Sequence, residues 1–423
     1  MPTALLLRPR DKGSVRGHCS GTPIGRVKTG RHPSFFVFRL SAESDVLMAD
    51  VDLAVIGAGL SACALASALR RKQTVDSLVI LEAGRGPGGR CATRRRRDDA
   101  LWRMDHGAPT LSFSGPPQGR LGALVDDLCD RGVLEPDAGC VVGLDGDGAL
   151  VEPPAHPLLC GPRWRGQPTM AAVAETLLAD AGEAVFTSFG ERISRLRWED
   201  GHWLLPGGWR AKRLVLSGTL LAHPRSLAML GWPDVPLRSA VAVGVDPSLD
   251  AALASIAVMT ASVRWNLMLE LPPVITDPGT GDPLPRQIWL TPEARDHCGV
   301  ERLVLHPQSD GRLGLVVHGL DDGAAIRPDT QPDLLVHHEK RLLAALPPLL
   351  GPWPALQAAL PEARSFGVMR WGAAQPLDHA LPRHLQWCPQ ARVGFCGDWI
   401  AGSGFGMAEG ALQSALDLAE TLR

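Results

Sequence analysis

The sequence contains no tyrosine, and its nine cysteines are scattered without a single C-x-x-C pair. An odd cysteine count without regular spacing is typical of proteins from a reducing compartment, so we expect a cytoplasmic location. No hydrophobic run approaches the roughly 20 apolar residues that a membrane-spanning helix requires. The formal net charge of −2 gives no reason to expect nucleic acid or an anionic membrane as a partner.

The first 47 residues differ in composition from the rest of the chain. Residues 1–40 contain six arginines and two lysines but one acidic residue, Asp11, and they show no period of 2 or 3.6. A cleaved transit-like peptide has this composition, and so can an over-long reading frame whose true start is Met48. We favour the second interpretation and expect disorder over residues 1–47 in either case.

The clearest motif occupies residues 51–90. Residues 53–56 form an apolar run that suits a buried parallel strand, residues 60–71 predict a helix, and residues 78–81 form a second apolar run. The turn between the first strand and the helix reads G-x-G-x-x-A, and an acid ends the second run. This order is the dinucleotide-binding β-α-β fingerprint.

Each residue of the fingerprint has a physical role. Gly57 permits the tight turn, Gly59 lets the backbone approach a pyrophosphate, and Ala62 keeps the helix close to the strand. The first N–H groups of the helix face the phosphates, and Glu82 can accept hydrogen bonds from a ribose diol. The alternative is a glycine-rich turn between core elements, which is disfavoured because the second strand and the acid are also in place.

A second glycine-rich turn, R-G-P-G-G-R, follows the acid and ends in Gly89 and Arg90. Such a turn suits a backbone folded over the adenosine and pyrophosphate, with Arg90 as a fixed cation. The run from Glu82 to Arg95, together with D-H-G-A at residues 105–108, resembles the flavin amine oxidase superfamily. Within that superfamily the chain is most similar to the renalase-like FAD-dependent oxidoreductases.

The resemblance implies an α/β fold. We expect a Rossmann-type, glutathione reductase-like FAD-binding domain interleaved with an α+β substrate domain built on a mixed sheet. The FAD-binding domain is assigned to residues 48–115, 165–234 and 377–423, and the substrate domain to residues 116–164 and 235–376. Sequence patterns predict helices over residues 121–132, 170–181, 333–346 and 407–422, and strands over residues 192–196, 209–216, 239–245, 286–290, 303–307, 313–319, 365–375 and 393–396.

The resemblance also implies further cofactor contacts. The backbone near Ile193 meets the adenine, and Gly397 and Asp398 contact the ribityl and pyrophosphate region. The last helix, which begins at Met407 and Ala408, points its N-terminus at the pyrimidine carbonyl of the flavin. This agrees with helix-dipole physics, because a reduced flavin carries negative charge there. We expect FAD to be held non-covalently, since no cysteine near the C-terminus has the glycine context used by relatives with covalent flavin.

Three residues are candidates for the substrate side of the flavin. The stretch R-W-G-A at residues 370–373 resembles a strand that returns to the flavin, so we assign Trp371 to a wall of the substrate pocket and Arg370 to a polar end of the substrate. Core packing is the alternative for Trp371. His106 could act as a base beside the flavin, or it could be a histidine held in place by hydrogen bonds.

Two absences narrow the chemistry. A second complete Rossmann unit is missing, so a dinucleotide substrate would bind at the flavin itself. Typical amine oxidases of the superfamily resemble one another in a lysine at flavin N5, whereas beyond residue 47 this chain has only Lys72, Lys212 and Lys340. We therefore expect an oxidase that takes a hydride onto flavin N5 from aberrant dihydronicotinamide dinucleotides, with dioxygen as acceptor and no metal. The alternatives are an amine oxidase, a polyene desaturase or isomerase, and a non-catalytic flavoprotein.

Overall fold

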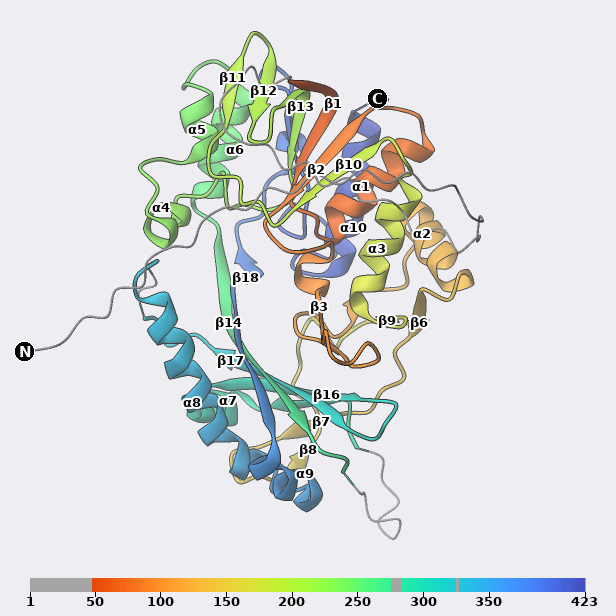
Figure 1. Ribbon diagram of the computed structural model, residues 1–423, viewed down its shortest axis with the longest axis vertical. Coiled ribbons are helices and arrows are strands. Elements are labelled where there is room, and N and C mark those ends of the chain that lie inside the picture. Colours follow the sequence, from red (N-terminus) through yellow and green to blue (C-terminus); the bar gives the residue numbers. More distant parts are fainter. Residues whose placement is uncertain (1–47, 275–283, 325–326, 423) are drawn as a thin grey trace, which may run out of the picture. The chain divides into compact units, whose positions relative to one another are not determined.

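The computed structural model describes residues 48–274, 284–324 and 327–422. The expectation of disorder over residues 1–47 therefore lies outside the described part of the chain. Two sheets organise the described residues, and each is covered by its own helices (Figure 1).

The first sheet contains the G-x-G turn and has eight strands. Its parallel core runs in the order β10-β2-β1-β13-β20, which is the arrangement that a β-α-β fingerprint predicts. An antiparallel hairpin and a short strand extend it at one side. The strands are β1 (Ala49–Ile56), β2 (Leu78–Glu82), β10 (Val185–Phe189), β11 (Arg197–Glu199), β12 (His202–Leu205), β13 (Trp209–Leu216), β19 (Trp387–Cys388) and β20 (Val393–Phe395).

Helices bury both faces of this sheet, because its central strands are apolar on both sides. One face packs against four helices, namely α1 (Leu60–Arg71), α2 (Gly119–Asp130), α3 (Met170–Asp180) and α10 (Ala408–Thr421). The other face packs against residues of α5 (Pro236–Ala240) and α6 (Pro247–Ala257), near the short helix α4 (Arg225–Leu230). This doubly covered parallel sheet is the Rossmann-like part of the predicted α/β fold.

The second sheet has seven strands in the order β18-β14-β17-β16-β15-β7-β8, and its pairs are antiparallel except for β15 with β7. It is therefore a mixed sheet, as predicted. Its strands are β7 (Val141–Leu144), β8 (Leu150–Val151), β14 (Thr260–Leu271), β15 (Gln287–Leu290), β16 (Val300–Pro307), β17 (Leu313–Leu320) and β18 (Arg364–Asp378).

One face of the second sheet is apolar and packs against the long helix α8 (Gln331–Leu349). Trp265, Leu267 and Leu269 alternate along β14 onto this face, as the period of a strand requires. The helices α7 (Pro292–Cys298) and α9 (Pro354–Ala359) complete the cover. The opposite face carries both kinds of side chain: Met268, Val304 and Val316 form an apolar cluster with Trp102 and Met104, and polar residues of the same strands line the cavity described below.

Short strands link the two sheets. β3 (Thr93–Arg95) pairs with β4 (Arg103–Asp105), while β5 (Leu111–Ser112), β6 (Leu134–Pro136) and β9 (Arg163–Gly166) form a three-stranded sheet. The long strands β14 and β18 lie side by side in Figure 1 and reach from the second sheet toward the first. They bring residues of the second sheet to the carboxyl ends of the parallel strands of the first sheet.

Two predicted strands are wrong. Residues 192–196 form no strand, and Arg192 and Ile193 instead line the cavity described below. The preceding Gly190 and Glu191 donate their N–H groups to the carbonyls of Gly84 and Glu82. The segment 239–245 is not a strand, since Pro236 begins a helical turn that continues to Ala240. The 12-residue strand β14 was not predicted at all.

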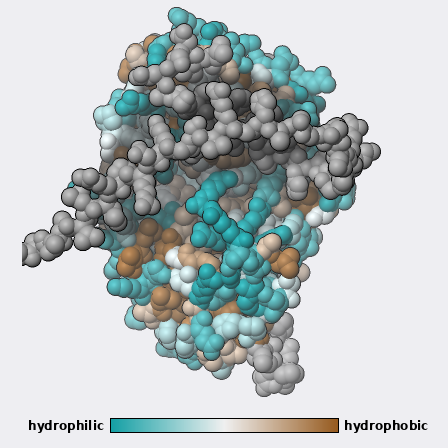
Figure 2. All heavy atoms as spheres, viewed as in Figure 1, coloured by the Kyte–Doolittle hydropathy of each residue, from teal (hydrophilic) through white to brown (hydrophobic). Residues whose placement is uncertain are grey.

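No helix in the described ranges is long and apolar enough to cross a membrane. On the face shown in Figure 2, hydrophilic side chains cover much of the lower half, with hydrophobic patches between them.

Candidate cofactor and substrate site

A cavity of about 660 Å³ lies where the carboxyl ends of the Rossmann strands meet β14 and β18. This volume falls within the range of small-molecule sites, and the carboxyl edge of a parallel sheet is the usual place for a ligand in such folds. The cavity brings together most of the predicted site residues. Those that line it are Gly57, Gly59, Glu82, Gly89, Arg90, Ile193, Arg370, Trp371, Asp398, Met407 and Ala408.

The glycine turns form a backbone cradle at one end of the cavity. Gly57 has φ +99°, and a Cβ there would lie 2.3 Å from the Ser217 hydroxyl oxygen, so only glycine fits. A Cβ on Gly59 would meet nothing within 4 Å, which leaves its backbone open to the cavity. The second glycine turn folds back onto the first, since Gly88 donates its N–H to Ala58 O at 2.8 Å.

Glu82 lies at the end of β2 and holds this cradle together. One carboxylate oxygen accepts the N–H of Ala58 at 2.7 Å, and the other accepts the N–H of Gly84 at 2.5 Å. Each carboxylate oxygen has more than one lone-pair site, so Glu82 retains acceptor capacity for a ligand hydroxyl. Its place beside both turns is the one that the fingerprint predicts for a ribose-binding acid.

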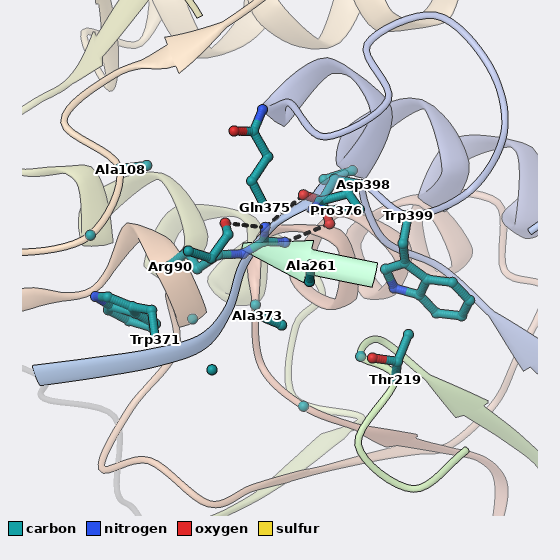
Figure 3. A pocket seen from close by; sticks show the side chains of 18 of the residues that line it. Arg90, Ala108, Thr219, Ala261, Trp371, Ala373, Gln375, Pro376, Asp398 and Trp399 are labelled. Atoms are coloured by element: carbon teal, nitrogen blue, oxygen red, sulfur yellow. Dashed lines mark hydrogen bonds and ion pairs between the residues drawn. The ribbon is translucent and has the colours of Figure 1, made fainter. Parts of the chain in front are cut away.

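Arg90 and Asp398 form a bidentate ion pair in the middle of the cavity wall (Figure 3). The Nη1 and Nη2 atoms of Arg90 donate to the two carboxylate oxygens of Asp398 at 2.6 Å each, and Nη1 also donates to Ala374 O at 2.9 Å. Burial would lower the pKa of Arg90, but the charge and hydrogen bonds of Asp398 raise it. Arg90 is therefore held as a fixed cation, with part of the guanidinium facing the cavity.

The N-terminus of α10 opens onto the same wall. Met407 is the N-cap residue, and its side chain makes no capping hydrogen bond. The first N–H groups of a helix have no partner within the helix, so those at Ala408 and Glu409 can bind a ligand acceptor. The preceding loop is held in place because Gly406 donates its N–H to Asp398 O at 2.8 Å.

Two predicted cofactor residues do not line the cavity. Ala62 is fully buried within the apolar core between α1 and the sheet, where it keeps the helix close to the strand. Gly397 has φ +149°, and a Cβ there would lie 2.2 Å from the indole nitrogen of Trp399, so it allows Trp399 to pack closely. Both residues shape the wall through packing.

Trp371 faces the cavity from β18 and rests on His106. The two rings stack with centroids 5.6 Å apart at 22°, and the indole N–H donates to His106 O at 3.3 Å. His106 itself does not line the cavity, and burial lowers its pKa to about 4. The imidazole is therefore neutral near neutral pH and supports the indole from behind.

The cavity also reaches residues that sequence analysis did not single out. They come from the polar face of the second sheet and from α4, and they are Arg225, Arg264, Asn266, Glu301, Arg302 and His318. Their signal in the sequence is polar residues that alternate with apolar ones along strands that are otherwise buried. The pattern alone does not say which polar residues share a cavity, because this depends on how the strands pair.

The donor set at the cradle fits an FAD molecule. An open backbone at Gly59, two helix N-termini, an acid at the end of β2 and a half-exposed arginine match the needs of a pyrophosphate and a ribose. The cavity continues past the cradle to Trp371 on β18.

Comparisons with known proteins agree with this fold. Residues 55–128 match the family described as NAD(P)-binding Rossmann-like domain. Putrescine oxidase bound to putrescine has a similar structure, with a TM-score of 0.55, 15% identity, and coverage of 88% of this chain and 99% of that chain. Cyclohexylamine oxidase from Brevibacterium oxydans IH-35A is similar with a TM-score of 0.56, 15% identity and the same coverage.

A protein from Exiguobacterium sp. 255-15, assigned as a protoporphyrinogen oxidase, is similar with a TM-score of 0.57 and 12% identity, over 88% of this chain and 99% of that chain. A search of curated protein sequences found no match. At these identities, the likeness shows a shared fold. The chain thus has a Rossmann-like nucleotide-binding domain joined to a mixed-sheet domain, as predicted from its sequence.

Proposed function

We propose that this chain is an FAD-dependent oxidoreductase. The observation that carries the proposal is the single cavity that joins the glycine cradle to Trp371 on the second sheet. A nucleotide site alone would need only the first sheet. A cavity that continues to an aromatic wall on another sheet provides a place for a second molecule beside the cofactor.

The residues around the cradle have distinct roles toward FAD. Gly59 and the N-terminus of α1 bind the pyrophosphate, Glu82 binds the adenosine ribose, and Ile193 packs on the adenine. Arg90, fixed by Asp398, adds positive charge near the phosphates. The N-terminus of α10, at Met407 and Ala408, contacts the flavin end of the cofactor. We infer non-covalent binding.

When bound, FAD supplies a hydride acceptor at flavin N5 and returns electrons to dioxygen with release of hydrogen peroxide. The chain's own contribution is then to bind, orient and exclude water, and this requires no strong base. The neutral, buried His106 agrees with this, because it supports Trp371 and does not reach the cavity.

The proposed substrate is a dihydronicotinamide dinucleotide that carries its hydride at the wrong ring carbon. A planar, electron-rich ring can stack beside Trp371, while Arg370 handles a phosphate or carboxamide end. Such a ring gives up hydride without prior deprotonation. This suits a cavity whose described lining contains no lysine.

Amine oxidation is the second candidate, because putrescine oxidase and cyclohexylamine oxidase share the fold. A protonated amine must lose a proton before it can give up hydride. Among the lysines that the structure describes, Lys212 is paired with Asp52 on the surface, and neither Lys72 nor Lys340 lines the cavity. The superfamily feature expected of an amine oxidase is therefore missing from this wall.

Cofactor release tests the proposal. The purified protein should be yellow, and acid precipitation should leave free FAD in the supernatant. A colourless protein, or flavin that stays with the pellet, would count against the proposed binding mode.

A further inference from the structure

The face of the second sheet that points into the cavity carries a row of buried polar side chains. Asn266 on β14 pairs with His318 on β17, and His318 pairs with Arg302 on β16. Directly paired residues point to the same face of a sheet, so these three side chains stand in one line across three strands. All three line the cavity.

A register shift in β16 adds a second charged residue to this face. Val300 pairs with Gly319 and Arg302 with His318, so two steps on β16 oppose one step on β17. Such a bulge re-aims side chains, and bulges are common beside active sites. As a result Glu301 and its neighbour Arg302 both line the cavity.

The row is buried, and each of its three side chains has one polar atom without a hydrogen-bond partner among the described residues, although the Asn266 amide nitrogen donates to His106 O at 2.8 Å. The exposed fractions are 1% for Asn266, 3% for His318 and 7% for Arg302. Within the described chain, Asn266 Oδ1, His318 Nε2 and Arg302 Nε have no hydrogen-bond partner. Buried polar groups are nearly always hydrogen-bonded, so unpaired atoms that share one cavity wall are placed to bind polar groups that enter the cavity.

The end of the cavity formed by the second sheet and α4 carries more positive than negative charge. Four arginines line it, and of these Arg264 is paired with Glu301, the single acid on this part of the wall. Arg225 donates to the Thr219 hydroxyl at 2.5 Å. Arg302 lies over the Trp289 ring at 4.6 Å from its centroid, and Arg370 lies over Trp265 at 5.4 Å.

Packing on a tryptophan does not account for Arg302. A cation–π contact uses the face of the guanidinium and leaves its N–H groups free to donate in the plane. The position is also costly for a structural cation, because burial lowers the pKa of Arg302 to about 10. A guanidinium with free in-plane donors, held against a tryptophan in a cavity wall, has the geometry that recognises a carboxylate or a phosphate.

We propose that Arg302, with His318 beside it, forms a subsite for an anionic group of the substrate, either a carboxylate or a phosphate. The unpaired atom of Asn266 is an amide oxygen, so it accepts a hydrogen bond from a neighbouring donor of the substrate and does not bind the anion itself. Arg225 adds a further positive charge to the cavity lining. The subsite favours anions and disfavours protonated amines of the same size. The inference rests on the proposed function, because it assigns the anionic group to the substrate that binds beside the cofactor.

Isothermal titration of the full chain as purified tests the subsite without any turnover. Four ligands share one aromatic ring and differ in one group: benzoate, phenyl phosphate, benzamide and benzylamine. We expect the two anions to bind and the neutral and cationic ligands to bind at least about tenfold more weakly, since a charge-assisted hydrogen bond is worth that factor or more. The tighter of the two anions identifies the carboxylate or the phosphate as the group on the substrate.

Three variants make the assignment specific. R302Q should weaken anion binding at least about tenfold, while R302K, which keeps the charge, should lose less. R295Q is the matched control, because Arg295 is an arginine on α7 that does not line the cavity, and it should bind the anions as the unaltered protein does. R370Q removes a half-buried cation that stands with Trp265 on the other face of the sheet, so it should weaken anion binding less than R302Q. If R302Q fails to fold, R302K is compared with the unaltered protein and should still bind the anions more weakly.

The inference is overturned if benzamide or benzylamine binds as tightly as the anions, if neither anion binds, or if R302Q, or R302K in its place, binds them unchanged. A protein that shows the expected anion pattern but whose flavin no dihydronicotinamide reduces would support the subsite and count against the proposed substrate. The two failures are therefore distinguishable.

Discussion

Arg90 and Asp398 lie 308 positions apart in the chain, yet they form a two-bond ion pair with nitrogen–oxygen distances of 2.6 Å. Arg90 ends the second glycine turn, and Asp398 follows the last strand of the same sheet. The pair thus joins the first and last parts of the Rossmann-like domain at the cavity wall (Figure 3). It fixes the arginine that faces the proposed pyrophosphate.

Asp398→Asn should lower the free energy of unfolding by about 1–3 kcal/mol, because it removes the charged acceptor of two hydrogen bonds from a site where Asp398 is almost fully buried. It should also weaken FAD retention. Asp127→Asn is the control, since Asp127 pairs with arginines at the surface and should cost at most about 1 kcal/mol. Equal losses in the two variants, measured by urea denaturation, would contradict the special role of the Arg90 pair.

Glu82→Lys should abolish FAD retention. It replaces the acceptor of two backbone N–H groups with a cation that faces the ribose, so the cradle and the ligand contact are both lost. Glu293→Lys makes the same charge change at an exposed residue on α7 and should leave the flavin content unchanged. The measurement is the ratio of flavin to protein absorbance after purification, and an unchanged ratio in the Glu82 variant would refute the assignment.

Trp371→Ala should slow reduction of the flavin by substrate at least about tenfold while leaving FAD bound, because the indole is a wall of the substrate end. Trp371→Phe keeps an aromatic face and should recover much of the rate. Stopped-flow absorbance under argon gives the rates, and the spectrum before mixing gives the flavin content. Loss of flavin in the alanine variant would contradict this assignment and indicate that Trp371 contacts the cofactor.

His306 should make the protein less stable in mild acid. Burial, then the nearby Arg286 and His106, lowers its pKa from 6.5 to about 3, so the unfolded chain binds more protons than the native state between these values. The stability that its neutral form provides is present above about pH 6.5 and is lost as the pH falls. Between about pH 7 and about pH 5 this loss is on the order of 2 kcal/mol.

His306→Asn removes the titrating group and should flatten this slope. The measurement is the free energy of unfolding of both proteins by urea across the acid range. Curves that stay parallel would show that His306 does not titrate as its buried position requires.

The nucleotide half of the site could be predicted from sequence because its parts are local. The turn at Gly57 and Gly59, the helix after it and the acid at Glu82 lie within about one β-α-β unit, where spacing determines geometry. The structure brings these residues to one cradle. Arg90 was expected as a fixed cation, but its partner Asp398 became visible only once the last strand was placed in the sheet.

The substrate half was predicted less completely because its residues meet through long-range pairing. The strand β14 was missed although Trp265, Leu267 and Leu269 recur with a period of two, because the intervening Met268 is apolar and weakens the alternation. Without β14 and its pairing to β17, nothing in the sequence places Asn266 beside His318.

The bulge in β16 illustrates the same limit. Ideal alternation would put Glu301 and Arg302 on opposite faces of the sheet, whereas the shift lets both line the cavity. A bulge depends on the partner strand, so a single-sequence pattern does not reveal it.

The most direct test of the proposed function is reduction of the bound flavin under argon by a panel of donors. We predict that dihydronicotinamide dinucleotides with hydride at C2 or C6 bleach the flavin rapidly, while primary amines and ordinary NADH do so slowly or not at all. Admitting air should restore the oxidised spectrum with release of hydrogen peroxide. If a primary amine instead bleaches the flavin faster than every dihydronicotinamide isomer, the account is contradicted and amine oxidation takes its place.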